Sequence, residues 1–82
     1  MANITKDEVK TLYAQHTEAT GQIFLDQAVE RAYYWSDGQP WLVNALARQV
    51  VEEILVNDYN RTITAEHIDQ AADDLMKRRD TH

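Results

Sequence analysis

The stretch WSDGQPWLVNALARQ, residues 35–49, decides the fold of this chain. It contains the only proline, Pro40, and one of the two glycines, Gly38, and Trp41 follows the proline directly. Gly38 suits a backbone turn with positive φ, and Pro40 suits the first position of a helix, where its missing N–H group costs nothing. The stretch therefore predicts a tight corner that ends one helix and begins the next at Pro40.

The helix expected after this corner is the most continuously apolar segment of the chain. It runs from Pro40 to near Asn57–Asp58, and its apolar residues are Trp41, Leu42, Val43, Ala45, Leu46, Ala47, Val50, Val51, Ile54, Leu55 and Val56. Such a distribution is wider than one stripe, which indicates contact with neighbouring elements on two sides. We therefore expect this third helix to be central.

A first helix is expected over about residues 6–19. Thr5-Lys6-Asp7-Glu8 is typical of a capping box, and Gly21 suits the left-handed position after a helix end. The helical spacing places four residues on one face, namely Val9, Leu12, Tyr13 and His16.

A second helix is expected between Gly21 and Gly38. Asp26 suits its first turn, where a carboxylate favours the helix dipole, and Ser36-Asp37-Gly38 ends it. Tyr34 and Trp35 make its end aromatic. Its apolar stripe is Phe24, Ala28, Val29, Ala32 and Tyr33.

The last helix is expected to begin after Thr64 as N-cap, with Ile63 and Ile68 in the positions of a hydrophobic staple. Residues 61–63 are consistent with a short extended connector. The predicted core stripe is Ile68, Ala71, Ala72, Leu75 and Met76, the predicted solvated face is Asp69, Asp73 and Asp74, and the predicted charge complement to the helix end is Lys77, Arg78 and Arg79. The fold class is therefore all-α, a single domain over residues 1–82 with about four helices.

Composition and spacing argue against several functions. The net charge of −6 argues against a duplex-binding surface, which needs clustered cations. No cysteine occurs, and His16, His67 and His82 lack the spacing of a helical metal site. The lone serine, Ser36, has no nucleophile elbow around it, so we expect no catalysis by this chain.

The chain has no run of roughly 18 or more apolar residues that would predict a membrane span. Its first residues, MANITKDE, lack the apolar core of a signal peptide. We expect a cytoplasmic protein without a membrane partner.

Two interpretations of the corner stay open on the residues alone. The amino end of the helix at Pro40 can receive an anion or the polar edge of a ring, and Trp41 with the Tyr34–Trp35 pair offers flat apolar surface for a nucleotide base. Gly38 and Pro40 are equally suited to a simple helix–helix corner, in which Trp41 plugs the core.

The segments TEATGQIF, AVERAYYWSDGQPWLVNALARQVVEEI and ITAEHIDQAADDLMKRRDTH resemble the helical lid region of a bacterial and archaeal family of AAA-like P-loop ATPases. The resemblance covers about residues 4–82, and GQPWLVNALARQ and RRDTH are its most specific parts. In the family, the helical lid follows a nucleotide-binding α/β core, and the chain continues beyond the segment that RRDTH matches. This sequence therefore looks like one domain of a longer protein.

The first of these motifs is similar to the G-x-P motif of STAND-type and archaeal ATPases, whose proline lies against the adenine of ATP. The resemblance implies that Gly38, Pro40 and Trp41 form the adenine side of a cofactor site completed by the core of the same polypeptide. ATP and Mg²⁺ are implied for that longer protein, with the phosphate-binding motifs upstream, and no cofactor is implied for this domain alone. Some AAA-type lids place a phosphate-sensing arginine where Trp41 stands, and Arg48, two turns further, is a poor substitute.

Two other classes of function remain as alternatives. Exposed apolar residues on the third helix would allow a protein-interaction or dimerisation module, including a homo-oligomer. A helix-turn-helix nucleic-acid binder would use the third helix for recognition, but Arg48 is its one cation.

Overall fold

The computed structural model describes residues 3–80, and for residues 78–80 it describes the backbone alone. The predicted all-α class is confirmed, because this part of the chain contains no strand and only a single isolated β-bridge. The helical elements, in order, are α1 (Lys6–Thr20), α2 (Asp26–Ser36), α3 (Pro40–Arg48), η1 (Gln49–Ile54) and α4 (Ala65–Asp80).

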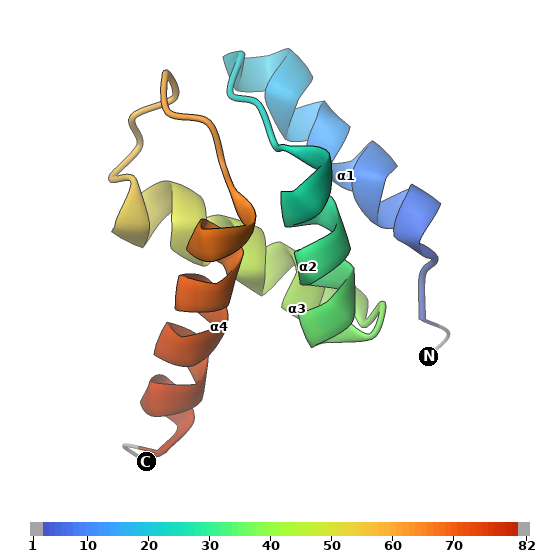
Figure 1. Ribbon diagram of the computed structural model, residues 1–82, viewed down its shortest axis with the longest axis vertical. Helices are drawn as coiled ribbons and strands as arrows, with labels where there is room; N and C mark the ends of the chain where they lie inside the picture. The colour runs from blue at the N-terminus through green and yellow to red at the C-terminus, as the bar shows by residue number, and fades with distance from the viewer. Residues whose placement is uncertain (1–2, 81–82) are drawn as a thin grey trace.

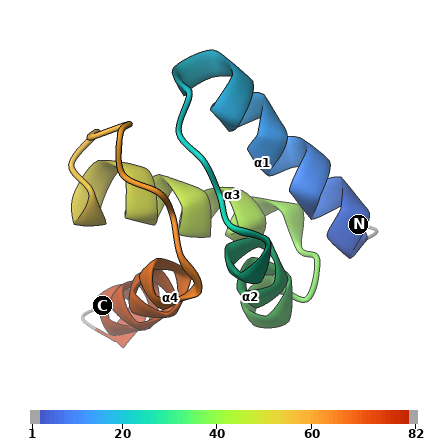
Figure 2. The same ribbon diagram turned by 45° about the horizontal axis from the view of Figure 1, so that its top comes forward.

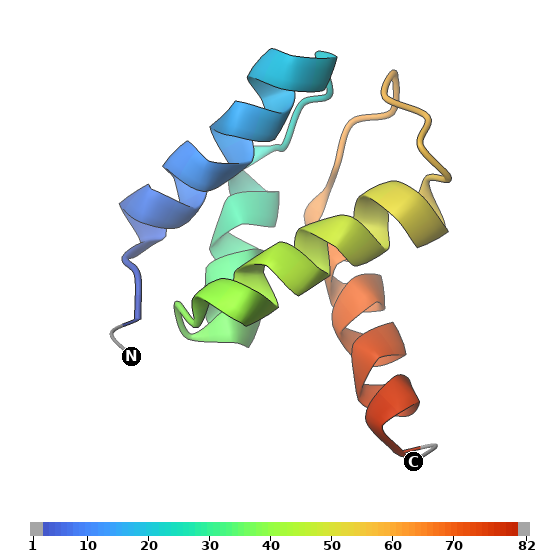
Figure 3. The same ribbon diagram turned by 180° about the vertical axis from the view of Figure 1, so that it is seen from behind.

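α3 and η1 form one continuous helix that crosses the other helices (Figures 1 and 3). α3 contacts both α2 and α4, and η1 contacts α4. α2 and α4 lie side by side beneath this helix, and α1 packs against α2 (Figure 2). The predicted central position of the third helix is therefore confirmed, and α2 shares it.

Both predicted ends of α1 are confirmed. The Thr5 hydroxyl accepts a hydrogen bond from the Glu8 amide at 3.2 Å, and the Glu8 carboxylate accepts one from the Thr5 amide at 2.9 Å. Gly21 has a φ of 81° and donates its N–H to the Thr17 carbonyl. The side chains of Val9 and Tyr13 enter the core, while Leu12 and His16 are half-buried at its edge.

Thr64 caps the start of α4 as predicted, but with a partner that the sequence did not indicate. The His67 amide donates to the Thr64 hydroxyl at 3.4 Å, and the Thr64 amide donates to Nδ1 of His67 at 3.1 Å. The imidazole thus takes the place that a glutamate takes in a capping box. Because Nδ1 accepts a hydrogen bond here, His67 has a structural role at the helix start.

The segment before α2 is extended, so the placement of Phe24 on the second helix is wrong. Phe24 forms a parallel bridge with Ile63, in which the Ile63 amide donates to the Ile23 carbonyl and the Leu25 amide to the Ile63 carbonyl. This bridge agrees with the short extended connector predicted at residues 61–63. Phe24 still reaches the core, because its ring stacks on Tyr13 with centroids 4.3 Å apart.

A buried amide side chain holds the loops at this end of the molecule together. Gln22 is 1% exposed, and its Nε2 donates to the carbonyls of Asp58 and Arg61 at 3.3 and 2.9 Å. Its Oε1 lies 2.8 Å from Nε2 of His16. The α1–α2 connection is therefore tied to the η1–α4 connection through one residue.

The third helix ends earlier than predicted and changes pitch before it ends. In the π-helical segment η1, the Leu55 amide donates to the Val50 carbonyl at 2.9 Å, five residues back. Val56 and Asn57 have positive φ and lie outside the helix, so the predicted end near residues 57–58 is wrong. Val56 is 71% exposed and does not join the core.

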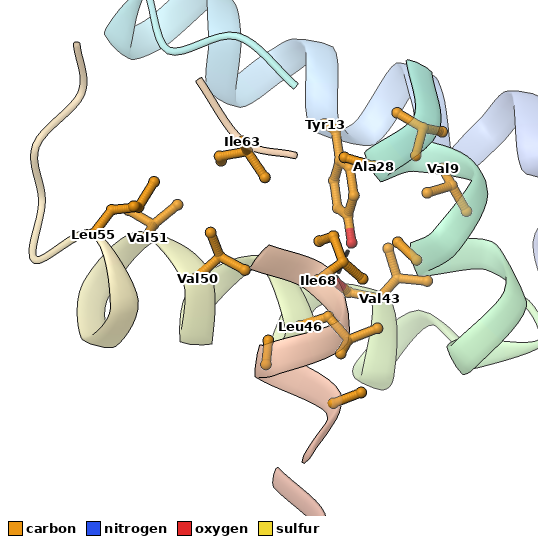
Figure 4. Packing of buried hydrophobic residues seen from close by; sticks show 14 residues of the cluster. Val9, Tyr13, Ala28, Val43, Leu46, Val50, Val51, Leu55, Ile63 and Ile68 are labelled. Carbon is orange, nitrogen blue, oxygen red and sulfur yellow. Dashed lines mark hydrogen bonds between the residues drawn. The ribbon is translucent and has the colours of Figure 1, made fainter. Parts of the chain in front are cut away.

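The core is one cluster of side chains between the helices (Figure 4). Ile63 and Ile68, predicted as a staple, are both fully buried. Met76 is 54% exposed, so its placement in the core stripe of α4 is wrong, and the stripe ends at half-buried Leu75. The fully or nearly fully buried apolar residues are Val9, Tyr13, Ala28, Val29, Ala32, Val43, Leu46, Val50, Val51, Leu55, Ile63, Ile68, Ala71 and Ala72.

Two carboxylates of the predicted solvated face have structural partners instead. Asp69 is half-buried and accepts a hydrogen bond from Nε1 of Trp35 at 2.8 Å. Asp74 is also half-buried and accepts one from Nε2 of buried Gln49 at 3.3 Å. These bonds join α4 to α2 and to η1, and they give each half-buried carboxylate a hydrogen-bond donor from a neighbouring element.

Asp73 remains exposed as predicted and pairs with Lys77 at 3.1 Å. This hydrogen bond raises the pKa of Lys77. The side chains of Arg78 and Arg79, which the sequence assigns to the helix end, lie outside the described residues, as does His82.

Tyr13 carries a buried hydroxyl whose loss has a pH-dependent effect. Its hydroxyl donates to the Val43 carbonyl at 2.8 Å, and burial raises the pKa of the Tyr13 phenol far above its usual range. Tyr13→Phe should lower the free energy of unfolding by about 1 kcal/mol at neutral pH, since the hydrogen bond is lost.

The stability difference between wild type and Tyr13→Phe should shrink as pH rises above about 10, because Tyr13 then ionises in the unfolded wild-type chain but not in the folded one. Urea unfolding at neutral pH and near pH 11 measures both effects, and the other tyrosines are common to both proteins. An equal difference at the two pH values would contradict this account of Tyr13.

Candidate functional site

The corner between α2 and α3 is built from two consecutive residues with positive φ. Asp37 has a φ of 52° and caps α2, and Gly38 follows with a φ of 77°. The predicted positive φ of Gly38 is confirmed, although Asp37 precedes it as the cap. The hydroxyl of buried Ser36 accepts the Gly38 amide at 3.1 Å, and the Ser36 carbonyl accepts the Gln39 amide at 3.0 Å. The corner is therefore fixed by its own hydrogen bonds, and Ser36 has a structural role.

The segment before α1 lies against the outer side of this corner. The Ile4 amide donates to the Gly38 carbonyl at 2.7 Å, and Nδ2 of Asn3 donates to the Asp37 carbonyl at 2.8 Å. A Cβ atom at Gly38 would collide with the Ile4 carbonyl oxygen. Gly38 is thus required twice, by its φ and by the close approach of another backbone.

Trp41 stands exposed at the start of α3. Pro40 is the first residue of the helix, as predicted, and is half-buried. The Trp41 side chain is 63% exposed, and its Nε1 donates to Oε1 of Gln39 at 3.0 Å. The interpretation in which Trp41 plugs the core is therefore wrong. The indole presents a flat apolar face to solvent and is oriented by a neighbouring amide.

The amino end of α3 has little capacity for an anion. Pro40 has no N–H group, and the amides of Leu42 and Val43 both donate to the Gln39 carbonyl at 3.0 Å. Of the first amides of the helix, only that of Trp41 is left to face a ligand. The corner is therefore better suited to contact an apolar or aromatic part of a ligand than a phosphate group.

The aromatic pair at the end of α2 is directed toward α4. Trp35 donates to Asp69, and the Trp35 ring meets that of Tyr34 edge to face at 5.4 Å. Tyr34 is 71% exposed and lines an open hollow with Arg31 and Ala65, the latter at the start of α4. Within the described residues, the pair therefore makes neither a stacked nor an edge-to-face contact with the Trp41 ring.

An open groove of about 420 Å³ separates α1 from the α3–η1 helix. Arg48 lies exposed at this groove, with Nε 3.9 Å from the Glu52 carboxylate. Arg48 lies about two turns after Trp41 on α3, as the sequence predicts. The groove is also lined by Leu12, His16, Asn44, Val51, Asn57 and Tyr59.

The metal-ligating residue types do not gather into one site in the described part of the chain. No group of three or more histidine, cysteine or acidic residues there could hold a metal ion. His16 and His67 belong to the separate hydrogen-bond groups at Gln22 and Thr64. Within the described residues, each helix is too short or too polar to cross a membrane.

Sequence reasoning found Gly38, Pro40 and Trp41 but missed the residues that support them. Ser36, Gln39 and the Asn3–Ile4 segment complete the corner through side-chain and backbone hydrogen bonds. Ser36 and Gln39 are polar residues on either side of the Asp37–Gly38 turn. Their polarity alone is only a weak indication that they hydrogen-bond within the corner. Nothing in the sequence signals the contact with Ile4, which is 34 residues from Gly38.

The fold and this corner define a small all-α domain with an exposed tryptophan at a helix start. Comparison with models of protein families, with curated proteins and with solved structures found no match in any of the three.

Proposed function

We propose that this chain is the helical lid of an AAA-like P-loop ATPase and that Pro40 and Trp41 cover the adenine of ATP. The observation that carries the proposal is the exposed Trp41 indole, 63% accessible, on a corner held by hydrogen bonds from both sides. A flat, oriented aromatic side chain is suited to stacking on a base. The resemblance of residues 38–49 to the adenine-covering motif of such ATPases supports the same role.

In this proposal the domain binds one part of the nucleotide and does no chemistry. The phosphates and Mg²⁺ are held by the nucleotide-binding core of the same polypeptide, since the α3 amino end offers a single amide. Closure of the lid on the core is a hinged movement that brings Trp41 against the base. The domain is then an effector of the ATPase that responds to the bound nucleotide.

Trp41→Ala in the full-length polypeptide should weaken ATP binding about 10-fold, because base–aromatic stacking contributes roughly 1–3 kcal/mol. Fluorescent-nucleotide titration measures the dissociation constant, and steady-state ATPase assays report the matching change in KM. Tyr34→Ala is the control, because Tyr34 is an aromatic residue at least as exposed as Trp41 that lines a hollow beside the start of α4. This substitution should leave the affinity unchanged. Equal affinities for Trp41→Ala and wild type would contradict the proposed cover.

A protein-interaction module is the second candidate, and the exposed apolar side chains favour it. They lie on several elements, however, and include Ile23 before α2, Trp41 on α3 and Met76 on α4. This scatter is less suited to one partner than a contiguous patch would be. Sedimentation at low micromolar concentration distinguishes the candidates, because a dimerisation module would stay associated.

A further inference from the structure

We propose that the segment Asn3–Thr5 is a strap that holds the α2–α3 corner in place, so that movement of the chain at Asn3 is passed directly to the start of α3. The strap runs beside the corner in the views of Figures 1 and 3. It is the one part of the described chain outside α2 and α3 that hydrogen-bonds to the two corner residues with positive φ.

The strap is anchored at three successive residues. Asn3 bonds the Asp37 carbonyl and Ile4 bonds the Gly38 carbonyl, while the Ile4 side chain packs against the core. Thr5 then caps α1 through its reciprocal bonds with Glu8. The strap thus connects the corner to the start of α1, in addition to the direct connection of the corner to α2.

The contact between Ile4 and Gly38 is tightly packed. Gly38 is buried, and the Ile4 carbonyl fills the space that a side chain would need. Gln39 follows immediately and orients the Trp41 indole through its Oε1. A displacement of the strap should therefore move Gly38, and with it Gln39 and the Trp41 indole that Gln39 orients.

The strap has a use that rests on the proposed function. If the chain before Asn3 leads to the nucleotide-binding core, the strap links movement of that core to the residue that covers the base. The strap itself is testable without nucleotide, so its failure and the failure of the adenine cover are separate results.

Amide hydrogen exchange followed by NMR tests the strap in this chain. Ile4→Pro removes the N–H group that donates to Gly38, and Ile4→Ala is the matched control that trims the side chain and keeps the N–H group. The amides of Gly38, Gln39 and Val43 should exchange roughly 3- to 10-fold faster in Ile4→Pro than in Ile4→Ala. The amides of buried Ala71 and Ala72 on α4 should be unchanged between the two.

Asn3→Ala is the second variant, since Asn3 is exposed and its loss does not disturb the core. It should give a smaller, roughly 2- to 3-fold acceleration confined to the same three corner amides. If Ile4→Pro does not fold, Asn3→Ala decides alone. Corner amides that keep their wild-type rates, or that accelerate only together with those of α4, would overturn the proposal.

Discussion

Gly38→Ala is expected to be among the most destabilising single substitutions in this domain, with a loss of about 3 kcal/mol in the free energy of unfolding. Two costs add at this position. An alanine is strained at a φ of 77°, and its Cβ would meet the Ile4 carbonyl oxygen, which is backbone and cannot rotate away. The strap or the corner must therefore shift. Urea unfolding followed by circular dichroism measures the loss.

Gly21→Ala is the matched control for this prediction. Gly21 has nearly the same φ, 81°, but open space surrounds the position of its missing Cβ. Its substitution should cost about 1 kcal/mol, the cost of the left-handed conformation alone. The difference between the two variants then isolates the close contact with Ile4. Equal losses in both variants would contradict the tight packing of strap against corner.

Leu46→Ala is expected to lower the free energy of unfolding by about 3 kcal/mol. Leu46 is fully buried near the middle of the continuous α3–η1 helix, on the segment that packs against α2 and α4 (Figure 4). Removal of its side chain leaves a cavity that these helices cannot close by a local shift. For a domain of this size that is a large part of the total stability. Thermal and urea unfolding should both show the loss.

Met76→Ala is the control for Leu46→Ala, because it removes a large apolar side chain that is not packed in the core. Met76 has a large apolar side chain, but it is 54% exposed on α4. Its substitution should change the free energy of unfolding by less than about 0.5 kcal/mol. A loss at Met76 comparable to that at Leu46 would mean that α4 packs differently from the structure described above.

The starts of α1, α3 and α4 were predictable because each depends on residues that are close together in sequence. Two of these starts are capped by local hydrogen bonds, at Thr5 with Glu8 and at Thr64. The third is set by the backbone preferences of Gly38 and Pro40, which do not depend on distant residues. The breadth of the apolar pattern after Pro40 also predicted contact on two sides, which α2 and α4 provide.

The parts that failed depend on contacts between distant residues. The π-helical pitch of η1 places Gln49, Val50 and Val51 consecutively in the interior, where Gln49 reaches Asp74 on α4. Helical periodicity has no signal for that arrangement. The extended conformation of Phe24 likewise depends on its bridge to Ile63, so its apolar character alone suggested a helix.

The candidate site shows the same division. The positive φ of Gly38 and the helix start at Pro40 follow from the sequence, and so does the place of Trp41 directly after the proline. The exposure of Trp41 did not follow, since an apolar residue early in an apolar helix fits the core equally well. The structure decides this point because Gln39 holds the indole outward and Ile4 occupies the other side of the corner.

Acrylamide quenching of Trp41 fluorescence tests the central claim most directly. In the longer ATPase polypeptide that the proposal implies, Trp35→Phe leaves Trp41 as the tryptophan reporter from this domain. We predict that Trp41 is freely quenched without nucleotide, and that saturating ATP protects it from acrylamide because the base covers the ring. Quenching of Trp41 that is the same with and without ATP would contradict the claim that this corner faces the nucleotide.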